Sequence, residues 1–353
     1  MPFCAGRPGV LPPYAPGPKG AATQNRRPAD FRGTQGRTPA GHKWDAKGEK
    51  HGVRMRGAVV VVTGASSGVG RAAALQCAGR GARVVLAARD AAALAAVGRE
   101  CRRRGGEGHV VPTDVADERQ VRDLAAAAVA RFGRIDVWVN AAGMGIPVRV
   151  DRAPARDLRR LLGINVLGAV HGARAAVPIM RRQGGGVVID IASLAGTVVD
   201  ELNVGGYAMS TAALVTFDDV LRQELATAGE YRIAICTILP GDPHVPFPPH
   251  ADSGSGRAPR SKTPAGSCER VARAVVRTAG RPRSRVLVAP YAGPFDAAYT
   301  LAPALLRRAA AWRTDRTYPG ASGPLRTVGR RAGRAAAMLV VRAAVRHRAR
   351  SRR

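Results

Sequence analysis

Three glycines with the spacing of a phosphate-binding turn follow the first apolar run of the chain. They lie in the string Thr63-Gly64-Ala65-Ser66-Ser67-Gly68-Val69-Gly70. Glycine suits a tight turn from strand to helix, because it lets a pyrophosphate approach bare backbone. The unpaired N–H groups of the next helix would then face the phosphates. An ordinary turn also uses glycine, but the flanking segments favour a dinucleotide site formed by Gly64, Ser66, Ser67, Gly68, Val69 and Gly70.

The end of the next apolar run carries a charge that bears on the kind of dinucleotide. Residues 84–88 are followed by Arg89 and Asp90. An acid at this tip would bond ribose hydroxyls and repel a 2′-phosphate, whereas a guanidinium can pair with that phosphate. Arg89 therefore predicts a preference for NADP(H), with NAD(H) as the alternative. Asp90 weakens the signal, and a solvated Arg in an Arg-rich chain would look the same.

The segments around these motifs alternate between strand-like and helix-like patterns. A continuous apolar, β-branched run, typical of a strand buried on both faces of a parallel sheet, occurs at 58–63. Further strands are expected at 83–87, 108–112, 135–139, 187–191, 233–239 and 285–289. Helices are expected at 69–80, 91–104, 117–132, 154–182 (broken or bent near Pro178) and 207–229. The alternation predicts an α/β fold with a doubly wound, mostly parallel sheet of about seven strands.

Composition divides the chain into four segments. Residues 1–54 are rich in Pro, Gly and Arg without hydrophobic periodicity, which predicts a disordered basic extension; Met55 is an alternative start of translation. Residues 55–290 would form the α/β domain, with a flexible loop at 242–266 beside the ligand crevice. Residues 291–323 look partly helical. The tail at 324–353 contains ten Arg and no acid.

The chain is strongly basic, and nearly all of its positive charge is Arg. Its 353 residues carry a formal net charge of +31, and five of the 56 basic residues are Lys. Arg, Ala, Gly and Pro are over-used together, which can reflect genome composition rather than function. Such charge attracts anions non-specifically, and we expect no specific nucleic-acid partner. A disordered tail is favoured over weak contact of the tail with an anionic membrane.

Other residue classes point away from several kinds of site. The five Cys form no C-x-x-C pair and the His show no ligand spacing, so neither a disulfide framework nor a metal site is expected. No run approaches the roughly 18 to 20 apolar residues of a membrane span. These features fit a cytoplasmic protein. Asp218, Asp219 and Glu224 share one helix, where we expect a solvated or dimer-facing surface.

Over about two thirds of the chain, the motifs and their order resemble the short-chain dehydrogenase/reductase (SDR) family of Rossmann-fold proteins. The glycine string resembles the family's dinucleotide turn. Further segments resemble family motifs in the same order: Asp114-Val115, Asn140-Ala141-Ala142-Gly143, Asn165, Ser193, Tyr207 with Thr211 in a Y-x-x-x-K-like segment, and Pro240-Gly241.

The resemblance implies an enzyme that interconverts an alcohol and a carbonyl on a small molecule. Tyr207 would exchange the hydroxyl proton, Ser193 would hold the substrate oxygen, and Asn165 would support a proton relay. The residues that would join the glycine turn and Arg89 at the cofactor are Asp114, Val115, Asn140, Gly143, Pro240 and Gly241. Family members commonly pair through helices like those at 154–182 and 207–229, so a homo-oligomer is also implied.

Three positions depart from the family pattern around the expected active site. Thr211 stands where the family has a Lys that binds ribose and lowers the pKa of the Tyr. Ala141 replaces the second Asn of N-N-A-G, and Val245 replaces a Thr after the P-G pair. The leading hypothesis is an NADP(H)-dependent oxidoreductase, and the alternative is a catalytically impaired pseudoenzyme that acts as a dinucleotide-binding scaffold or sensor. A third hypothesis is an anchoring protein whose Rossmann domain is only structural.

Overall fold

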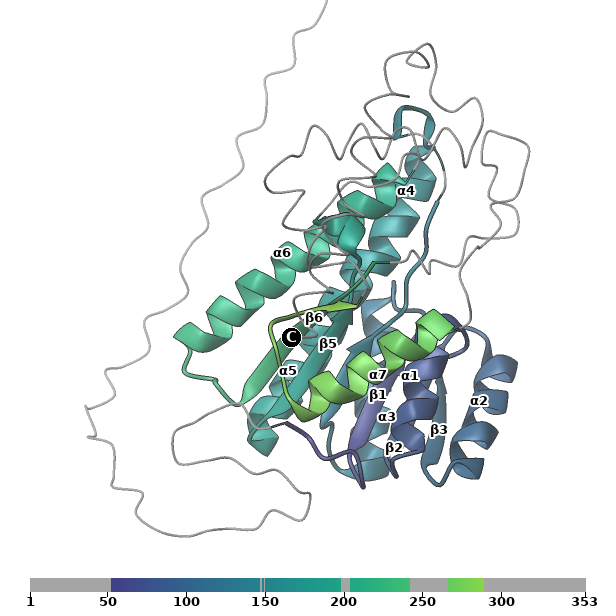
Figure 1. The fold of residues 1–353 in the computed structure, drawn as a ribbon, viewed down its shortest axis with the longest axis vertical. Coiled ribbons are helices and arrows are strands. Elements are labelled where there is room, and N and C mark those ends of the chain that lie inside the picture. Colours follow the sequence, from purple (N-terminus) through teal and green to yellow (C-terminus); the bar gives the residue numbers. More distant parts are fainter. Residues whose placement is uncertain (1–51, 147, 149, 198–203, 242–265, 289–353) are drawn as a thin grey trace, which may run out of the picture. The chain divides into compact units, whose positions relative to one another are not determined.

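A seven-stranded parallel sheet forms the centre of the computed structural model, which describes residues 52–146, 148, 150–197, 204–241 and 266–288 (Figure 1). The strands are β1 (Val59–Thr63), β2 (Arg83–Ala88), β3 (Glu107–Pro112), β4 (Val137–Asn140), β5 (Gly186–Ile191), β6 (Ile233–Pro240) and β7 (Arg285–Val288). They lie in the order β3-β2-β1-β4-β5-β6-β7, and every neighbouring pair is parallel. The predicted doubly wound α/β fold is confirmed.

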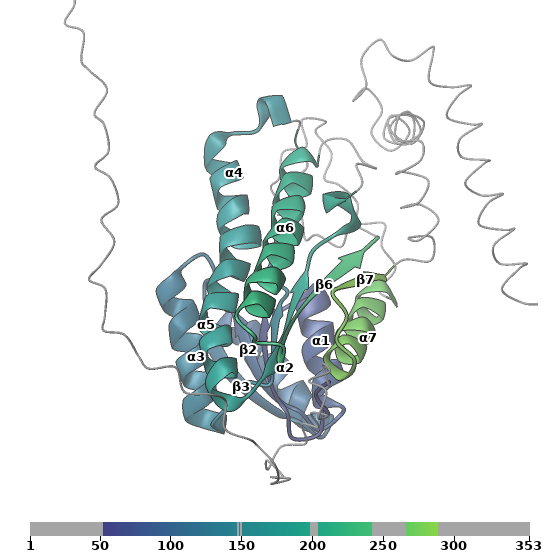
Figure 2. The same cartoon turned by 90° about the vertical axis from the view of Figure 1, so that its left-hand side faces the viewer.

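Helices cover both faces of this sheet. They are α1 (Gly68–Ala78), α2 (Ala91–Arg103), α3 (Glu118–Phe132), α4 (Ala155–Leu162), α5 (Gly168–Gln183), α6 (Gly205–Thr227) and α7 (Gly266–Gly280). Helices α1, α2 and α7 contribute to the core on one face, whereas α3, α5 and α6 contribute to the core on the other (Figures 1 and 2).

The continuous apolar character of β1 follows from its place between these two layers. Val60 and Val62 belong to the core under α1 and α7, and Val59 and Val61 belong to the core under α3 and α5. Successive side chains of a strand point to opposite faces, so a strand covered on both sides needs apolar residues at every position. All five residues of β1 are buried.

The long helix predicted at 154–182 is interrupted, but not at the proline. Helix α5 continues through Pro178, and the irregular turn is a π-helix at Gly163–Leu167 that separates α4 from α5. The break expected near Pro178 was therefore wrong. A proline removes one N–H and crowds the carbonyl four residues earlier, which here belongs to Arg174. Arg174 is an exposed residue, so this carbonyl lies on the side of α5 where water can hydrogen-bond to it.

The helical stretch Ala155–Gln183 is long and apolar enough to cross a membrane, by length and composition only. A helix of a protein core passes the same test. Ala176, Val177 and Met180 of α5 are buried in the core against the sheet. Core packing thus accounts for the apolar side of this stretch.

The structure corrects the expected start of the domain and adds a helix. Val53, which we assigned to the extension at 1–54, is buried in the core, and its N–H donates to the Ala279 carbonyl at 2.7 Å. Helix α7 was not predicted, although Val271, Ala272 and Val275 have helical spacing and are buried. The predictions for 1–51, the loop at 242–265 and residues 291–353 concern segments outside the described residues.

Candidate active site

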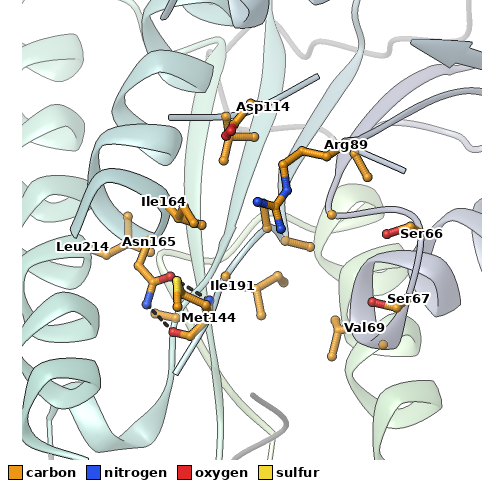
Figure 3. A pocket seen from close by; sticks show the side chains of 18 of the residues that line it. Ser66, Ser67, Val69, Arg89, Asp114, Met144, Ile164, Asn165, Ile191 and Leu214 are labelled. Carbon is orange, nitrogen blue, oxygen red and sulfur yellow. Dashed lines mark hydrogen bonds between the residues drawn. The ribbon is translucent and has the colours of Figure 1, made fainter. Parts of the chain in front are cut away.

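A cavity of about 530 Å³ lies at the carboxyl ends of the strands, the edge at which open parallel sheets bind ligands (Figure 3). The predicted site residues that line it are Gly64, Ser66, Ser67, Gly68, Val69, Arg89, Asp114, Val115, Gly143, Asn165, Tyr207, Thr211 and Pro240. The predicted site residues outside its lining are Gly70, Asn140, Ser193 and Gly241. Val245 is outside the described residues.

The glycine turn between β1 and α1 has the shape that a pyrophosphate requires. Gly64 has a φ of +66°, and a Cβ there would lie 2.7 Å from the Ala141 carbonyl oxygen. Gly68 has a φ of +52° and faces open space. No side chain caps the first turn of α1, so its N–H groups beside Ser67 and Gly68 are available to an anion in the cavity. The residues present fit a dinucleotide phosphate.

Gly70 does not line the cavity, but it allows α1 to pack closely against the glycine turn. A Cβ on Gly70 would lie 2.2 Å from the Gly64 carbonyl oxygen. Helix α1 can approach the end of β1 this closely only because the residue has no side chain. The sequence predicted Gly70 as part of the dinucleotide site. In the structure Gly64 and Gly68 line the cavity, whereas Gly70 packs against Gly64 outside it.

Arg89 and Asp90, at the tip of β2, both line the cavity but are engaged differently. Asp90 is the N-cap of α2, and its Oδ1 accepts a hydrogen bond from the Ala93 N–H at 2.9 Å. The Arg89 side chain is exposed and extends into the cavity (Figure 3). The Asp90 carboxylate, which weakened the prediction of NADP(H) preference, is therefore engaged in capping α2, whereas the Arg89 guanidinium faces the space for a ligand.

The segment after β3 forms a rigid part of the cavity wall. Asp114 Oδ1 accepts from the Ala116 N–H at 3.0 Å, and the Asp114 N–H donates to Gln120 Oε1 at 2.9 Å. The Val115 carbonyl oxygen lies 3.0 Å from His171 Nδ1. These bonds hold Asp114 and Val115 in place before any ligand arrives.

Asn140 lies behind the cavity, in a buried hydrogen-bond network. Its Oδ1 accepts from Trp138 Nε1 at 2.7 Å, and its Nδ2 donates to Asp190 Oδ1 at 2.6 Å and to the Ala169 carbonyl at 3.3 Å. Gly241 is also outside the cavity, where its N–H donates to the Val288 carbonyl at 3.2 Å. In this structure both residues hold strand ends together, and neither reaches the cavity expected to hold the cofactor.

Tyr207 and Ser193 meet at the inner part of the site. The two side chains are hydrogen-bonded, and Ser193 Oγ also accepts from the Ala195 N–H at 3.2 Å. Burial raises the pKa of Tyr207 to about 12, against which the Ser193 hydrogen bond acts to lower it. A Tyr with this pKa stays protonated at neutral pH, where it is a weak acid and is rarely present as the base.

Asn165, in the π-helical turn, ties three segments together. Its Oδ1 accepts from the Met144 N–H at 2.8 Å, and its Nδ2 donates to the Met144 carbonyl at 2.9 Å and to Ser210 Oγ at 3.0 Å. Figure 3 shows the paired bonds to Met144. Both amide hydrogens are therefore in use, so Asn165 holds the wall of the site together rather than offering a free donor.

Thr211 faces the cavity but directs its hydroxyl elsewhere. Its Oγ1 donates within α6, with the Tyr207 carbonyl at 3.1 Å and the Ala208 carbonyl at 3.1 Å as acceptors. Among the described residues, no cation contributes to the pKa of Tyr207. The position that carries the charge of the family Lys is thus electrically neutral in this chain.

Several residues of the site were missed by sequence reasoning. Thr63 Oγ1 accepts from the Ala141 N–H at 3.1 Å and the Ala142 N–H at 3.3 Å, which joins the ends of β1 and β4. Arg160, Ile164 and Leu214 also line the cavity. The polar end of an otherwise apolar strand pointed to Thr63, whereas nothing local marks the other three.

The chain is similar in sequence to known oxidoreductases. A family model described as short chain dehydrogenase matches residues 58–247. The chain is 33% identical over 210 residues to the uncharacterized oxidoreductase YxnA of Bacillus subtilis, covering 58% of each chain. It is 33% identical over 189 residues to the 7alpha-hydroxysteroid dehydrogenase of Escherichia coli, covering 54% of this chain and 72% of the relative.

Solved structures show the same fold with nicotinamide dinucleotides bound. An SDR from Burkholderia phymatum in complex with NAD matches with a TM-score of 0.61 and 29% identity, over 70% of this chain and 94% of the other. A metagenomic short-chain oxidoreductase in complex with NADP matches with a TM-score of 0.55 and 30% identity, over 66% and 97%. These neighbours support a nicotinamide dinucleotide as the ligand class.

Proposed function

The chain belongs to the short-chain dehydrogenase family, and from this membership we propose that it is an NADP(H)-dependent oxidoreductase that interconverts a small alcohol and a carbonyl. One observation carries the proposal: the same cavity is lined by the glycine turn, by Arg89 and by Tyr207. Groups that can bind phosphate and a group that can donate a proton thus line the same cavity. The substrate, the choice of NADP(H) and turnover itself are parts of the proposal.

Residues of the cavity rim would hold the cofactor. The backbone N–H groups at the start of α1 would bind the pyrophosphate, and Arg89 would pair with a 2′-phosphate. Asp114 and Val115, fixed by their hydrogen bonds, would flank the adenine side. When bound, NADP(H) would supply or accept the hydride.

Tyr207 would perform the proton transfer at its Oη. In reduction the phenol O–H bond would break and its proton would move to the substrate oxygen, where the π pair of the C=O bond forms the new O–H bond. The carbonyl carbon would receive the hydride, and Tyr207 would be left as the phenolate. Ser193, bonded to Tyr207, would orient the substrate oxygen. Asn165 would keep Met144 and α6 at a fixed separation around the reacting group.

A second candidate is a dinucleotide-binding protein with impaired turnover. The specific observation in its favour is Thr211, whose hydroxyl is bonded within α6 and supplies no charge to Tyr207. Dinucleotide binding needs only the glycine turn and the rim, whereas proton transfer needs a Tyr with a pKa in the working range. The two candidates therefore differ in turnover and not in binding.

The proposal is tested with parent protein and Tyr207→Phe. We expect the parent to bind NADP+ more tightly than NAD+ and to oxidise NADPH in the presence of a panel of aldehydes and ketones. Tyr207→Phe should bind NADP+ as the parent does and lose turnover. Absence of dinucleotide binding would exclude both candidates, and binding with no turnover in either protein would select the second.

Arg89→Asp is expected to weaken NADP+ binding by about tenfold to 100-fold, because a 2′-phosphate would then face an added negative charge in a partly solvated cavity. Binding of NAD+ should change little or improve. Arg99→Asp is the matched control, because Arg99 is an exposed residue of α2 outside the cavity lining and makes the same change in net charge. Titration of both variants with both dinucleotides measures the effect.

Two outcomes would contradict the role of Arg89. Equal affinities of the parent for NADP+ and NAD+ would show that this side chain does not select the cofactor. An equal loss in Arg99→Asp would show that the overall positive charge, rather than Arg89, attracts the phosphate.

The cytoplasmic location is proposed on family grounds alone, whereas the proposed assembly also has support from exposed apolar side chains. Three apolar side chains on the outer faces near α5 and α6 are well exposed: Leu167 at 50%, Met209 at 47% and Val220 at 48%. A second copy of the chain would cover them. We accordingly propose that the chain forms a homo-oligomer. From family membership we also propose that it is located in the cytoplasm.

A further inference from the structure

Two carboxyl groups are fully buried beside the active site, and the proposed chemistry uses neither of them. Asp190 lies in β5 shortly before Ser193, and Asp218 lies in α6 about three helical turns after Tyr207. Both residues are 0% exposed. The solvated or dimer-facing surface expected for Asp218 is thus wrong, although Glu224 of the same helix is exposed.

Each carboxyl group has one oxygen that accepts an ordinary hydrogen bond. Asn140 Nδ2 donates to Asp190 Oδ1 at 2.6 Å, and Thr237 Oγ1 donates to Asp218 Oδ2 at 2.5 Å. These donors come from β4 and β6, the strands on either side of β5. The bonds fix the orientation of both carboxyl groups.

The other two oxygens have no donor. Asp190 Oδ2 and Asp218 Oδ1 are buried without a hydrogen-bond partner among the described residues, although the two side chains lie within hydrogen-bonding reach of each other. An ionised carboxylate can only accept hydrogen bonds, so two carboxylates cannot bond to each other. A bond between these oxygens therefore requires one proton.

The charged neighbour of the pair does not remove this requirement. Arg222, on α6, is the cation that acts on both carboxyl groups. Its guanidinium donates to Asp219, to the Ile235 carbonyl at 3.1 Å, to the Ser284 carbonyl at 3.3 Å and to Thr237 Oγ1 at 3.4 Å, so it reaches Asp218 only through the Thr237 hydroxyl. The groups that face the pair from β4 and β6, Asn140 and Thr237, carry no charge. Two buried negative charges with this little compensation would be costly.

We propose that Asp190 and Asp218 share one proton at neutral pH, and that this proton joins β5 to α6. These elements carry Ser193 and Tyr207, so the pair acts as a positioning device for the site; that part of the inference rests on the proposed function. The pair itself touches neither cofactor nor substrate space, because neither residue lines the cavity.

A shared proton makes folding depend on pH with a definite sign. Burial raises the pKa of both carboxyl groups above their ordinary value. The folded chain then binds one more proton than the unfolded chain at every pH between the unfolded Asp pKa, near 4, and the raised value. Stability from this source is full below the unfolded pKa and is lost as the pH rises toward the folded pKa.

The test compares chemical unfolding of the full-length parent and Asp218→Asn between pH 6 and pH 8. An Asn at 218 can donate its own N–H to Asp190 and accept from Thr237, so it keeps the bond without a proton. We expect the folding equilibrium constant of the parent to fall about tenfold per pH unit relative to that of the variant, or about 100-fold over the range. Asp190→Asn, which restores the bond from the other side, should behave like Asp218→Asn.

Asp219→Asn is the matched control on the same helix. Asp219 is bonded to Arg222 and Arg285, and its pKa is lowered, so it is ionised throughout this range. This variant should keep the pH dependence of the parent. Parallel pH profiles for the parent, Asp190→Asn and Asp218→Asn would overturn the proposal.

Infrared spectra with 13C-labelled Asp give a second, direct readout. At pH 7 the parent should show the C=O band of a protonated carboxylic acid in a buried site, and both Asn variants should lack it. Absence of the band in the folded parent would also overturn the proposal. This readout and the unfolding test need no turnover, so a failure of the proposed enzymatic function leaves both of them decisive.

The positioning part is tested by Asp218→Ala beside Asp218→Asn. Loss of the bond in the Ala variant should lower kcat at least about fivefold without a matching change in NADP+ affinity, and the Asn variant should restore it. Equal kcat values for the two variants would show that the shared proton does not position Ser193 and Tyr207.

Discussion

Thr211→Lys should increase carbonyl reduction by one or more orders of magnitude at neutral pH. An ammonium about 4 Å from the Tyr207 oxygen contributes about 4 kcal/mol at a moderate effective dielectric, which corresponds to about three pKa units. Burial raises the pKa of Tyr207 to about 12 despite the opposing effect of Ser193, and no cation among the described residues lowers it. A Lys would therefore bring this pKa toward the working range of a general acid or base.

The structure supports this substitution sterically. Thr211 lines the cavity, so a longer side chain at this position has open space to enter. The Thr hydroxyl bonds only to carbonyls of its own helix, and an α-helix does not need these bonds. Initial rates of NADPH oxidation with an activated carbonyl, measured against pH for parent and variant, give the result.

The direction in which the pH dependence of alcohol oxidation shifts tests whether the added Lys lowers the pKa of Tyr207. The base form of Tyr207 is needed for alcohol oxidation and appears only as the pH rises toward its pKa. Oxidation by the parent should therefore still be rising at pH 9, and the rise should occur at lower pH in Thr211→Lys. Tyr207→Phe in the Lys background must abolish the gain. Brisk turnover by the parent, with little change on adding Lys, would show that another group activates Tyr207.

Gly64→Ala is expected to disrupt the dinucleotide site, because the added Cβ would clash with protein backbone atoms beside the glycine turn. The new Cβ would lie 2.7 Å from the Ala141 carbonyl oxygen and 2.8 Å from the Ala142 backbone nitrogen. These are backbone atoms at the end of β4, so no side-chain rotation relieves the clash. Overpacking and the positive φ together cost about 2 to 5 kcal/mol, through unfolding or displacement of the turn. NADP+ affinity should fall at least about 30-fold, or thermal unfolding should occur well below that of the parent.

Gly133→Ala separates the two components of this cost. Gly133 ends α3 with a φ of +80° and lies outside the cavity lining, and a Cβ added to it would have no neighbouring atom within 4 Å. Its substitution adds the positive-φ penalty alone, about 1 to 2 kcal/mol, and should leave NADP+ affinity unchanged. If both variants lose the same stability and neither loses affinity, the close approach of β1 and β4 at Gly64 is not needed for binding.

The sequence by itself determined the sheet and the phosphate turn, because both depend on local features. The run at Val59–Thr63 is short, β-branched and apolar at every position but the last, which favours a strand covered on both faces. Gly64 and Gly68 could be assigned because positive φ and bare backbone are properties of single residues. The helix break near Pro178 was wrong for a related reason: the local rule ignores whether solvent can serve the freed carbonyl of Arg174.

Only the tertiary structure decided which side chains meet. Asn140 looked like a cofactor ligand, but packing of α5 on β4 turns it toward Trp138 and Asp190. Asp218 looked like a surface acid, because no sequence rule tells which helix face a strand from another part of the chain will cover. Its proximity to Asp190 exists because α6 packs against β6, the strand next to β5, and the proposed shared proton stabilises the fold only after folding has removed the water.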